Sequence, residues 1–329
     1  LELIMVKGWQ VVAQKDLYKT GDMVIYCPID AVLPLELSDK MEVTKYLSRQ
    51  RVRTARLRGE YSQGLIIPLH LLPDYKEDEH GLVCIPLPGV DVKEKLGIVK
   101  YEPTIPLNMA GQVEKYHPLF YKYTDIENIK NYPNVLQEGE EVVITEKIHG
   151  TNFRVGLVNG ELMVGSKNWG LKEEASNLYW QIVHKYPQIE QAMRNFYKDC
   201  EAVGQETPPN FVLYGEIYGG GIQKGMKYDI NEPTVRFFDV KVGDMFLDWH
   251  KANLWFKLNN LETVPILYSG EWRWEELKYL ADGPSKIANH IKEGFVVRPK
   301  TEREERRVGR VIFKHISEAY LLKDYGDLH

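Results

Sequence analysis

The feature that most restricts the fold is a hairpin signal near the middle of the chain. Asn159-Gly160 separates two apolar runs, 153–158 and 161–164. An Asn-Gly pair readily adopts the positive φ angles of a two-residue hairpin turn, so the two runs are expected to pair as antiparallel strands. A third apolar run, 142–146, lies just before them. The sequence therefore predicts an antiparallel sheet in the second half of the chain.

Helices are predicted within this sheet region. Two of them, at 173–186 and 188–198, are separated by Pro187, which lacks a backbone N–H donor. Further strands are predicted at 211–217, 235–240, 295–297 and 308–314, and further helices near 247–258, 271–280 and 317–323. This mixture of helices with antiparallel strands places the region in the α+β class.

The first third of the chain has short apolar runs separated by turns. Strands are predicted at 3–12, 23–27, 65–69 and 82–87. This pattern predicts a small β-barrel whose first strand is truncated in this numbering. Residues 101–139 are rich in Pro, Tyr, Asn and Lys and show little periodicity, which is typical of a connection between domains. We therefore predict domains at 1–105 and 139–329, joined by a connecting segment at 106–138.

Composition limits the setting in which the chain works. No apolar run approaches the roughly 18 residues of a membrane-spanning helix, so no membrane partner is expected. Cys27, Cys84 and Cys200 are odd in number and far apart, which gives neither a disulfide framework nor a zinc site. We therefore expect the cytoplasm or another reducing intracellular compartment.

Charge gives a weaker signal. The net charge of −5 argues against a protein coated in basic surface. One local cluster stands out, five arginines within ten residues: Arg49, Arg51, Arg53, Arg56 and Arg58. Taken alone, such a run usually forms a solvated charged face.

Lys147 follows directly after the predicted strand 142–146. A glycine, a hydroxyl and an amide come next, at Gly150, Thr151 and Asn152. A free lysine has a pKa of about 10.4, so a nucleophilic lysine needs burial or a neighbouring cation to lose its proton. Lys314, at the end of the predicted strand 308–314, is a candidate for that cation. A single lysine in such a position is nevertheless usually ordinary surface.

Two glutamates lie near the ends of predicted strands. Glu216 lies near the end of the strand 211–217, shortly before Gly219-Gly220-Gly221, and Glu293 lies just before the strand 295–297. The glycines after Glu216 bring the backbone close to something, whereas the Glu293 carboxylate can bind Mg²⁺ directly or through water, as phosphoryl chemistry requires. Seen separately, the glycines after Glu216 indicate only a loop. Glu293 by itself is equally consistent with a solubilising charge at a strand edge.

Taken in order, these motifs resemble the covalent nucleotidyltransferase superfamily, which comprises ATP-dependent DNA ligases, RNA ligases and GTP-dependent mRNA capping enzymes. The matching elements are Lys147 to Gly150, Glu216, Phe238-Asp239, Glu293-Gly294-Phe295-Val296 and Lys314. Within the superfamily, the spelling Lys-x-His-Gly-Thr-Asn at Lys147 to Asn152 is typical of RNA ligases. Gly8-Trp9-Gln10-Val11-Val12 and 57–64 resemble the N-terminal OB domain of a nick-sealing branch of those ligases.

The resemblance implies an ATP-dependent RNA ligase that joins 3′-hydroxyl and 5′-phosphate ends, with a nicked duplex as partner and Mg²⁺ or Mn²⁺ as cofactor. Lys147 would take AMP from ATP and pass it to the 5′-phosphate, and the 3′-hydroxyl would then displace AMP. The implied catalytic residues are Lys147, His149, Glu216, Glu293 and Lys314, with Glu216 and Glu293 as metal ligands. The implied cofactor contacts are Glu146, Ile148, Asn152, Lys167, Phe238 and Arg298.

The resemblance also suggests individual roles. Phe238 would lie on the adenine, Lys314 on the α-phosphate and Glu216 on the ribose, whereas His149 and Asn152 would act mostly in the later steps. The five arginines would bind the nucleic-acid backbone through its phosphates.

Two positions depart from the family pattern. Ile312 stands where these ligases often carry another lysine, and Arg310 is the candidate replacement. Lys167 stands after the hairpin where arginine is more usual, and the two side chains are not chemically equivalent.

Two alternatives remain at this level. A DNA nick ligase or GTP-dependent capping enzyme is disfavoured by the spelling from His149 to Asn152, and by the fifteen residues after Lys314, too few for a C-terminal OB domain. A catalytically inactive homologue that only binds nucleic acid is disfavoured because Lys147, Glu216, Glu293 and Lys314 are all retained.

Overall fold

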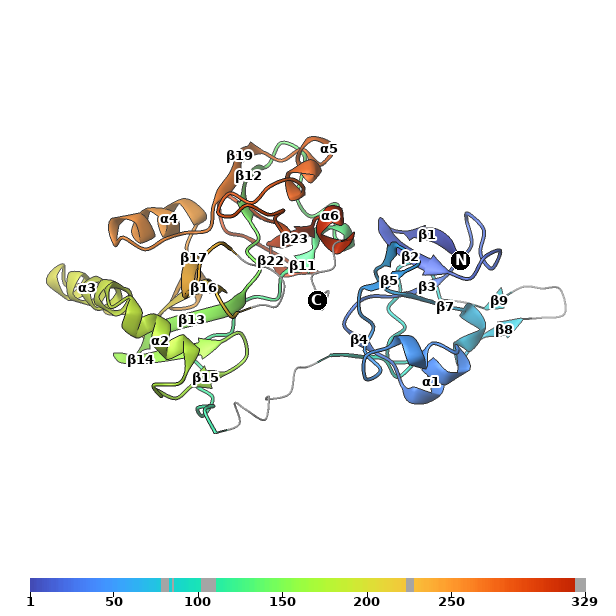
Figure 1. The fold of residues 1–329 in the computed structure, drawn as a ribbon, viewed down its shortest axis with the longest axis horizontal. Coiled ribbons are helices and arrows are strands. Elements are labelled where there is room, and N and C mark those ends of the chain that lie inside the picture. Colours follow the sequence, from blue (N-terminus) through green and yellow to red (C-terminus); the bar gives the residue numbers. More distant parts are fainter. Residues whose placement is uncertain (78–82, 85, 102–110, 223–227, 323–329) are drawn as a thin grey trace. The chain divides into compact units, whose positions relative to one another are not determined.

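The computed structural model describes residues 1–77, 83–84, 86–101, 111–222 and 228–322 (Figure 1). The chain divides into two compact units between residues 104 and 105. Within the described ranges, no helix has both the length and the apolar character needed to cross a bilayer.

The first unit consists of short antiparallel strand pairs around a small apolar core. The pairs are β1 (Glu2–Val6) with β2 (Trp9–Ala13), β3 (Ile25–Cys27) with β7 (Leu65–Ile67), β4 (Ala31–Val32) with β10 (Val99–Lys100), β5 (Ala55–Leu57) with β6 (Glu60–Ser62), and β8 (Lys76–Glu77) with β9 (Val83–Cys84). Helix α1 (Leu35–Lys40) packs Leu37 against Val52 and Ile67 in this core. The prediction of one strand over 3–12 is wrong, because Lys7 and Gly8 turn the chain with φ angles of 49° and 81°.

The second unit contains two sheets. The six-stranded sheet has the order β15-β14-β13-β16-β17-β18, and the five-stranded sheet has the order β11-β23-β20-β12-β19. The strands of the first are β13 (Thr151–Val158), β14 (Glu161–Ser166), β15 (Gly170–Leu171), β16 (Asn210–Gly219), β17 (Pro233–Val242) and β18 (Met245–Phe246). Those of the second are β11 (Glu127–Asn128), β12 (Glu141–Glu146), β19 (Ile266–Glu271), β20 (Gly294–Pro299) and β23 (Phe313–Ile316). The predicted hairpin is confirmed, since Val158 pairs with Glu161 across Asn159-Gly160.

Three helices pack on one face of the six-stranded sheet (Figure 1). They are α2 (Leu178–Lys185), α3 (Gln188–Ala202) and α4 (Trp249–Leu258). The predicted break at Pro187 is confirmed, but α2 begins later than residue 173. Its start is set by Asn177, whose side chain accepts hydrogen bonds from the N–H groups of Tyr179 and Trp180.

Two predicted elements near the C-terminal end differ from the structure. The single strand 308–314 is wrong: β22 (Gly309–Arg310) pairs with β21 (Glu304–Glu305), and β23 begins only at Phe313. The helix predicted at 271–280 shrinks to α5 (Trp274–Leu277), followed by a 3₁₀ turn, because Glu271 ends the strand β19, which the sequence pattern missed. The last helix is α6 (Glu318–Leu322).

The described part of the segment 106–138 packs into the second unit. Phe120 and Tyr123 are buried against residues of both sheets, and β11 pairs in parallel with β23. The described part of this segment is therefore packed against the sheets as part of the second unit.

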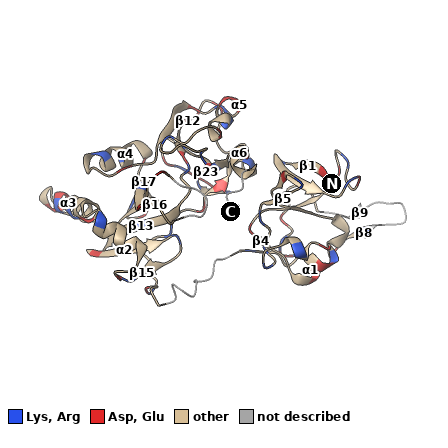
Figure 2. Cartoon of the chain, viewed as in Figure 1, with Lys and Arg blue, Asp and Glu red and all other residues tan. Residues whose placement is uncertain are grey.

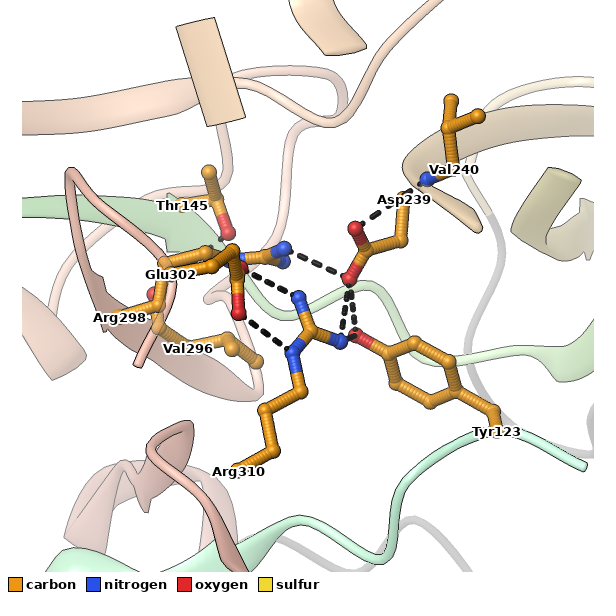
Figure 3. A network of polar contacts seen from close by, with 8 residues as sticks. All are labelled: Tyr123, Thr145, Asp239, Val240, Val296, Arg298, Glu302 and Arg310. Atoms are coloured by element: carbon orange, nitrogen blue, oxygen red, sulfur yellow. Dashed lines mark hydrogen bonds and ion pairs between the residues drawn. The ribbon is translucent and has the colours of Figure 1, made fainter. Parts of the chain in front are cut away.

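A buried ionic network joins the two sheets (Figure 3). Oδ2 of Asp239, on β17, lies 2.7 Å from Nη1 of Arg298 on β20 and 2.7 Å from Nη1 of Arg310. Tyr123 donates its hydroxyl to the same oxygen at 2.8 Å. Glu302 accepts hydrogen bonds from the other guanidinium nitrogens of Arg310 at 2.8 and 2.5 Å. Although burial disfavours a charged carboxylate, Arg310 and Arg298 outweigh it and hold the pKa of Asp239 below its ordinary value.

We predict that Asp239→Asn lowers the free energy of unfolding at pH 7 by about 3–5 kcal/mol, because two buried arginines lose their shared counter-charge. Since the folded pKa is lowered, this contribution is present above the unfolded pKa of about 3.9 and is lost as pH falls through the folded value. Denaturant titrations at pH 7 and pH 3.5 measure it. The exposed Asp244, which accepts a hydrogen bond from Tyr121, provides the Asp→Asn control. Equal losses in both variants would contradict the prediction.

Candidate active site

Strand alternation places two predicted site residues on the face of the six-stranded sheet that is opposite to the three helices. Phe153 on β13 and Leu213 on β16 pack under the helices, so their neighbours in the pleat point to the opposite face. Asn152 and Glu216 are directly paired in register on that face. The five-stranded sheet meets the same space, since Val296 and Ile312 pack with Tyr214. The candidate site therefore lies between the two sheets.

A β-bulge explains the position of Phe238. Tyr214 pairs with Asp239 and the next residue, Gly215, pairs with Phe237, so Phe238 is the extra residue of β17. A bulge puts two successive side chains on one face of a strand. Phe238 and Asp239 consequently both face the space between the sheets, and the Phe238 ring meets Tyr123 edge-on with centroids 5.0 Å apart.

Lys147 is held by an ion pair with Glu293. Its Nζ lies 2.7 Å from Oε1 of Glu293, and its backbone N–H donates to the carbonyl of Gly294 at 3.0 Å. Burial would lower the pKa of Lys147, but the carboxylates of Glu293 and Glu216 raise it overall. Burial likewise opposes the charge of Glu293, yet Lys147 and His149 bring the pKa of that carboxyl to about 2. In this state the lysine is protonated.

Glu216 is the second carboxylate beside the lysine. Burial raises its pKa to about 8, although Lys147 acts in the opposite direction and a backbone hydrogen bond from Gly150 also favours the charged form. The paired residue, Asn152, has a buried Oδ1 with no hydrogen-bond partner among the described residues. An unsatisfied buried oxygen is costly, which points to a donor supplied by a ligand.

Lys314 is close enough to Lys147 for the two positive charges to interact. Burial lowers the pKa of Lys314, and the positive charge of Lys147 lowers it further. Ile312 lies just before β23, so it does not share a strand face with Lys314, and it is buried in the apolar cluster with Phe238. Arg310 is committed to Asp239 and Glu302, so it does not replace the missing lysine.

Lys167 lies at the edge of the same group. Its charge lowers the pKa of both Glu216 and Lys314. Its Nζ pairs with Oδ1 of Asp125 at 2.7 Å, and both side chains are about half exposed. Among the predicted cofactor contacts, Lys167 is therefore the best candidate for a second cation beside Lys314.

Three other predicted cofactor contacts are either paired or buried within the protein. Glu146 accepts hydrogen bonds from Ser285 Oγ at 2.5 Å and from the N–H of Lys286 at 2.8 Å. The side chain of Ile148 is buried. Arg298 is almost fully buried against Asp239. For the side chains of Glu146 and Arg298, the structure thus gives a structural role.

His149 is fixed by two tyrosines that sequence reasoning missed. Its backbone N–H donates to the Tyr228 hydroxyl at 2.6 Å, and its Nδ1 lies 3.0 Å from the Tyr320 hydroxyl. The same Nδ1 lies 3.5 Å from Oε2 of Glu293. No motif marks either tyrosine, because both come from segments distant in sequence. The one available signal for Tyr320 was its position in a predicted helix shortly after Lys314, because a helix that follows a site strand so closely can return to the site.

Comparison with known sequences identifies the family. A sequence model described as RNA ligase matches residues 140–316, the stretch that carries Lys147, Glu216, Phe238, Glu293 and Lys314. The chain belongs to the RNA ligase family. A second model, described as an OB-fold domain, matches residues 1–69. A search of curated proteins gave no match.

Solved RNA ligase structures resemble nearly the whole chain. A variant of the Naegleria gruberi RNA ligase with ATP and Mn is 30% identical, with 97% of this chain and 92% of that chain covered and a TM-score of 0.72. A second variant, with AMP and Mn, has the same identity and coverage and a TM-score of 0.73. The same ligase with PPi is 29% identical over 97% and 95% of the two chains, with a TM-score of 0.73. These matches confirm the predicted OB-fold and antiparallel-sheet architecture.

The oxygen donors of this RNA ligase fit a divalent metal that arrives with phosphates. Within the described ranges, no group of three or more His, Cys, Asp or Glu is placed to hold an ion unaided. Glu293 and Glu216 both act on Lys147, and Oε2 of Glu293 is buried without a hydrogen-bond partner among these residues. Mg²⁺ is usually held by one or two carboxylates, with substrate phosphates and water completing its shell.

In the OB-fold unit the five predicted arginines have different settings. Arg51 pairs with Asp30 at 2.6 Å and lies 4.0 Å from the ring centre of Tyr101. Arg53 is half-buried, whereas Arg49, Arg56 and Arg58 are exposed. Charge elsewhere in the unit is mixed, as on α1 (Figure 2). Nucleic-acid binding by these residues stays a prediction, and Arg51 has the strongest structural ties.

We predict that Gly150→Ala destabilises the ligase unit by about 1–3 kcal/mol. A Cβ at this position would lie 2.3 Å from the carbonyl oxygen of Ile217 and 2.8 Å from Cγ of Glu216. Thermal and denaturant unfolding measure the loss. Gly111→Ala is the matched control, because no atom lies within 4 Å of its added Cβ. Unchanged stability of Gly150→Ala would contradict the prediction and would show that the backbone at Ile217 can shift to make room for the added Cβ.

Proposed function

We propose that this RNA ligase uses ATP and a divalent metal to join 3′-hydroxyl and 5′-phosphate ends of RNA through a lysyl-AMP intermediate on Lys147. The related Naegleria gruberi structures with ATP, AMP and Mn support the choice of nucleotide and metal. We further propose that the ends meet at a nick in a duplex and that the role is RNA repair.

The observation that carries this proposal is the grouping around Lys147. Its Nζ contacts Glu293 at 2.7 Å, and Glu216 and Lys314 are both close enough to interact with it electrostatically. A binding module has no need of a half-buried lysine among two carboxylates and a second lysine. A covalent nucleotidyl carrier needs this combination, because the amine must lose a proton and attack a phosphate.

The proposed reaction consists of three displacements at phosphorus. The Lys147 amine attacks the α-phosphate of ATP, a nitrogen–phosphorus bond forms and pyrophosphate leaves. The 5′-phosphate of the RNA then takes AMP from the lysine. Finally the 3′-hydroxyl attacks the capped 5′-phosphate, forming the phosphodiester and releasing AMP. Positioning and charge neutralisation account for most of the catalysis in reactions of this kind.

The residues of the site would divide these tasks. Glu293 and Glu216 would hold Mg²⁺ or Mn²⁺, which when bound neutralises charge on the carboxylates and on the phosphates. Lys314 and Lys167 would face the phosphates as cations. Phe238, held beside Tyr123 by the bulge, would offer its ring to the adenine. Asn152 would meet a ligand donor through its unpartnered oxygen.

The family, the motif after Lys147 and the cysteines support the assignment to RNA and to a cellular compartment. The family and the motif from Lys147 to Asn152 favour RNA over DNA. The OB-fold unit would bind the strand or duplex, and its exposed arginines would contact phosphates. The free thiols of Cys27 and Cys200 are consistent with a reducing intracellular compartment.

The first test uses labelled ATP or GTP with Mg²⁺ or Mn²⁺. We expect a covalent adduct from ATP that Lys147→Ala abolishes, because Lys147 supplies the amine that forms the nitrogen–phosphorus bond. The exposed Lys257 on α4 is the matched control, and Lys257→Ala should label normally. Adduct from GTP alone would move the assignment to capping chemistry. Absence of any wild-type adduct would leave only the inactive, nucleic-acid-binding homologue.

The second test concerns the OB-fold unit. We expect the double charge reversal Arg56→Glu/Arg58→Glu to weaken sealing of nicked RNA at least tenfold while labelling of Lys147 is unchanged, since phosphate contacts act on the substrate and not on ATP. The slope of log rate against log salt should also become shallower.

Lys93→Glu/Lys95→Glu gives the same change of net charge at two exposed positions of the same unit and is the matched control. Equal losses in labelling and sealing would contradict the assignment of the arginines, as would equal losses in both double variants.

A further inference from the structure

His149 is held from two sides by buried tyrosines. Tyr228 fixes the backbone by accepting the His149 N–H at 2.6 Å, and the Tyr320 hydroxyl lies 3.0 Å from Nδ1 of the imidazole. Tyr228 and Tyr320 are 3% and 4% exposed, so water does not compete for these contacts. The ring of His149 is thus restrained in both place and orientation.

Tyr320 is itself fixed by the start of α6. Ser317 Oγ accepts the N–H of Tyr320 at 3.1 Å and donates to Oδ1 of Asp282 at 2.7 Å. The N–H of Ser317 donates to the carbonyl of Glu293 at 2.9 Å. The helix start is therefore hydrogen-bonded to the backbone of Glu293, the proposed metal ligand just before β20, and these bonds hold Tyr320 beside His149.

The histidine and the nucleophile share one carboxylate. Oε1 of Glu293 lies 2.7 Å from Nζ of Lys147, and Oε2 lies 3.5 Å from Nδ1 of His149. A 3.5 Å contact is too long for a strong hydrogen bond, whereas 3.0 Å to the Tyr320 hydroxyl is within the usual range. The hydroxyl can donate to a neutral ring or accept from a protonated one. It therefore anchors Nδ1 and keeps the ring from closing on Glu293.

We propose that Tyr320 is a positioning residue for catalysis: its hydroxyl holds the imidazole of His149 away from Glu293 in the orientation that the sealing steps require. This proposal rests on the proposed function, in which His149 acts after AMP has been attached to Lys147. Loss of the hydroxyl frees Nδ1 to move onto Oε2 of Glu293, which misplaces the ring and leaves the ion pair of Lys147 intact.

The experiment compares Tyr320→Phe with the wild type in two single-turnover assays on the full chain. One measures lysyl-AMP formation from ATP, and the other measures sealing of a nicked duplex whose 5′ end already carries AMP. We expect sealing to slow about tenfold and lysyl-AMP formation to change less than about twofold, the size of one lost hydrogen bond. In a His149→Ala background, Tyr320→Phe should have no further effect on sealing, because its target is gone.

Tyr197→Phe is the matched control. It removes a hydroxyl that donates to the carbonyls of Leu157 and Pro208 at 3.3 and 2.9 Å, away from the site. It should leave both steps unchanged. Ser317→Ala loosens the start of α6 without touching the ring of Tyr320 and should slow sealing selectively, to a smaller degree.

Four outcomes would overturn the proposal. They are equal slowing of both steps by Tyr320→Phe, unchanged sealing, sealing by Ser317→Ala that equals the wild type, and a full additional loss in the His149→Ala background. A wild-type protein that forms no lysyl-AMP and seals nothing would overturn the proposed function as well. If the wild type seals and the Tyr320→Phe variant seals at the same rate, this inference alone is overturned.

Discussion

The carboxylate of Asp239 is shared by Arg298, Arg310 and Tyr123, and the arrangement of the two sheets depends on this contact. Arg298 lies on β20, Arg310 on β22 and Tyr123 before β11, and all three side chains are buried. Because a buried charge without its partner is so costly, the network favours the observed placement of the sheets. The bulge that turns Asp239 inward also turns Phe238 inward, so the structural contact and the proposed nucleotide contact are set by the same irregularity.

The charges around Lys147 favour a protonated, inactive lysine when nothing is bound. Glu293 and Glu216 raise the pKa of the amine, against burial, and the positive charge of Lys147 in turn lowers the pKa of Lys314. A nucleotide with its metal would change this balance, because it would occupy the carboxylates. In the proposed reaction, the arrival of the substrate would thus favour deprotonation of Lys147. This arrangement avoids a reactive amine in the resting protein.

Both ends of the second unit contribute to the site. The segment before Lys147 supplies Tyr123 beside Phe238 and Asp125 beside Lys167. The segment after Lys314 supplies Tyr320 beside His149. These additions surround a centre whose ordered motifs already identify the family. They also explain why Ile312 is tolerated, since its apolar side chain packs beneath Phe238 and Tyr123, where a lysine would be buried.

The sequence by itself determined the local elements and the order of the chemistry. The Asn159-Gly160 hairpin, the break at Pro187 and the series from Lys147 to Lys314 depend on neighbouring residues or on chain order, and both are legible in one dimension. The bulge at Phe238, the partners of Arg298 and Arg310 and the tyrosines on His149 were decided only by the tertiary structure. Tyr320 lies 171 residues from His149 in sequence, and Arg298 lies 59 from Asp239. Contacts over such separations leave no periodic pattern, because they depend on how whole sheets and helices pack once each has formed.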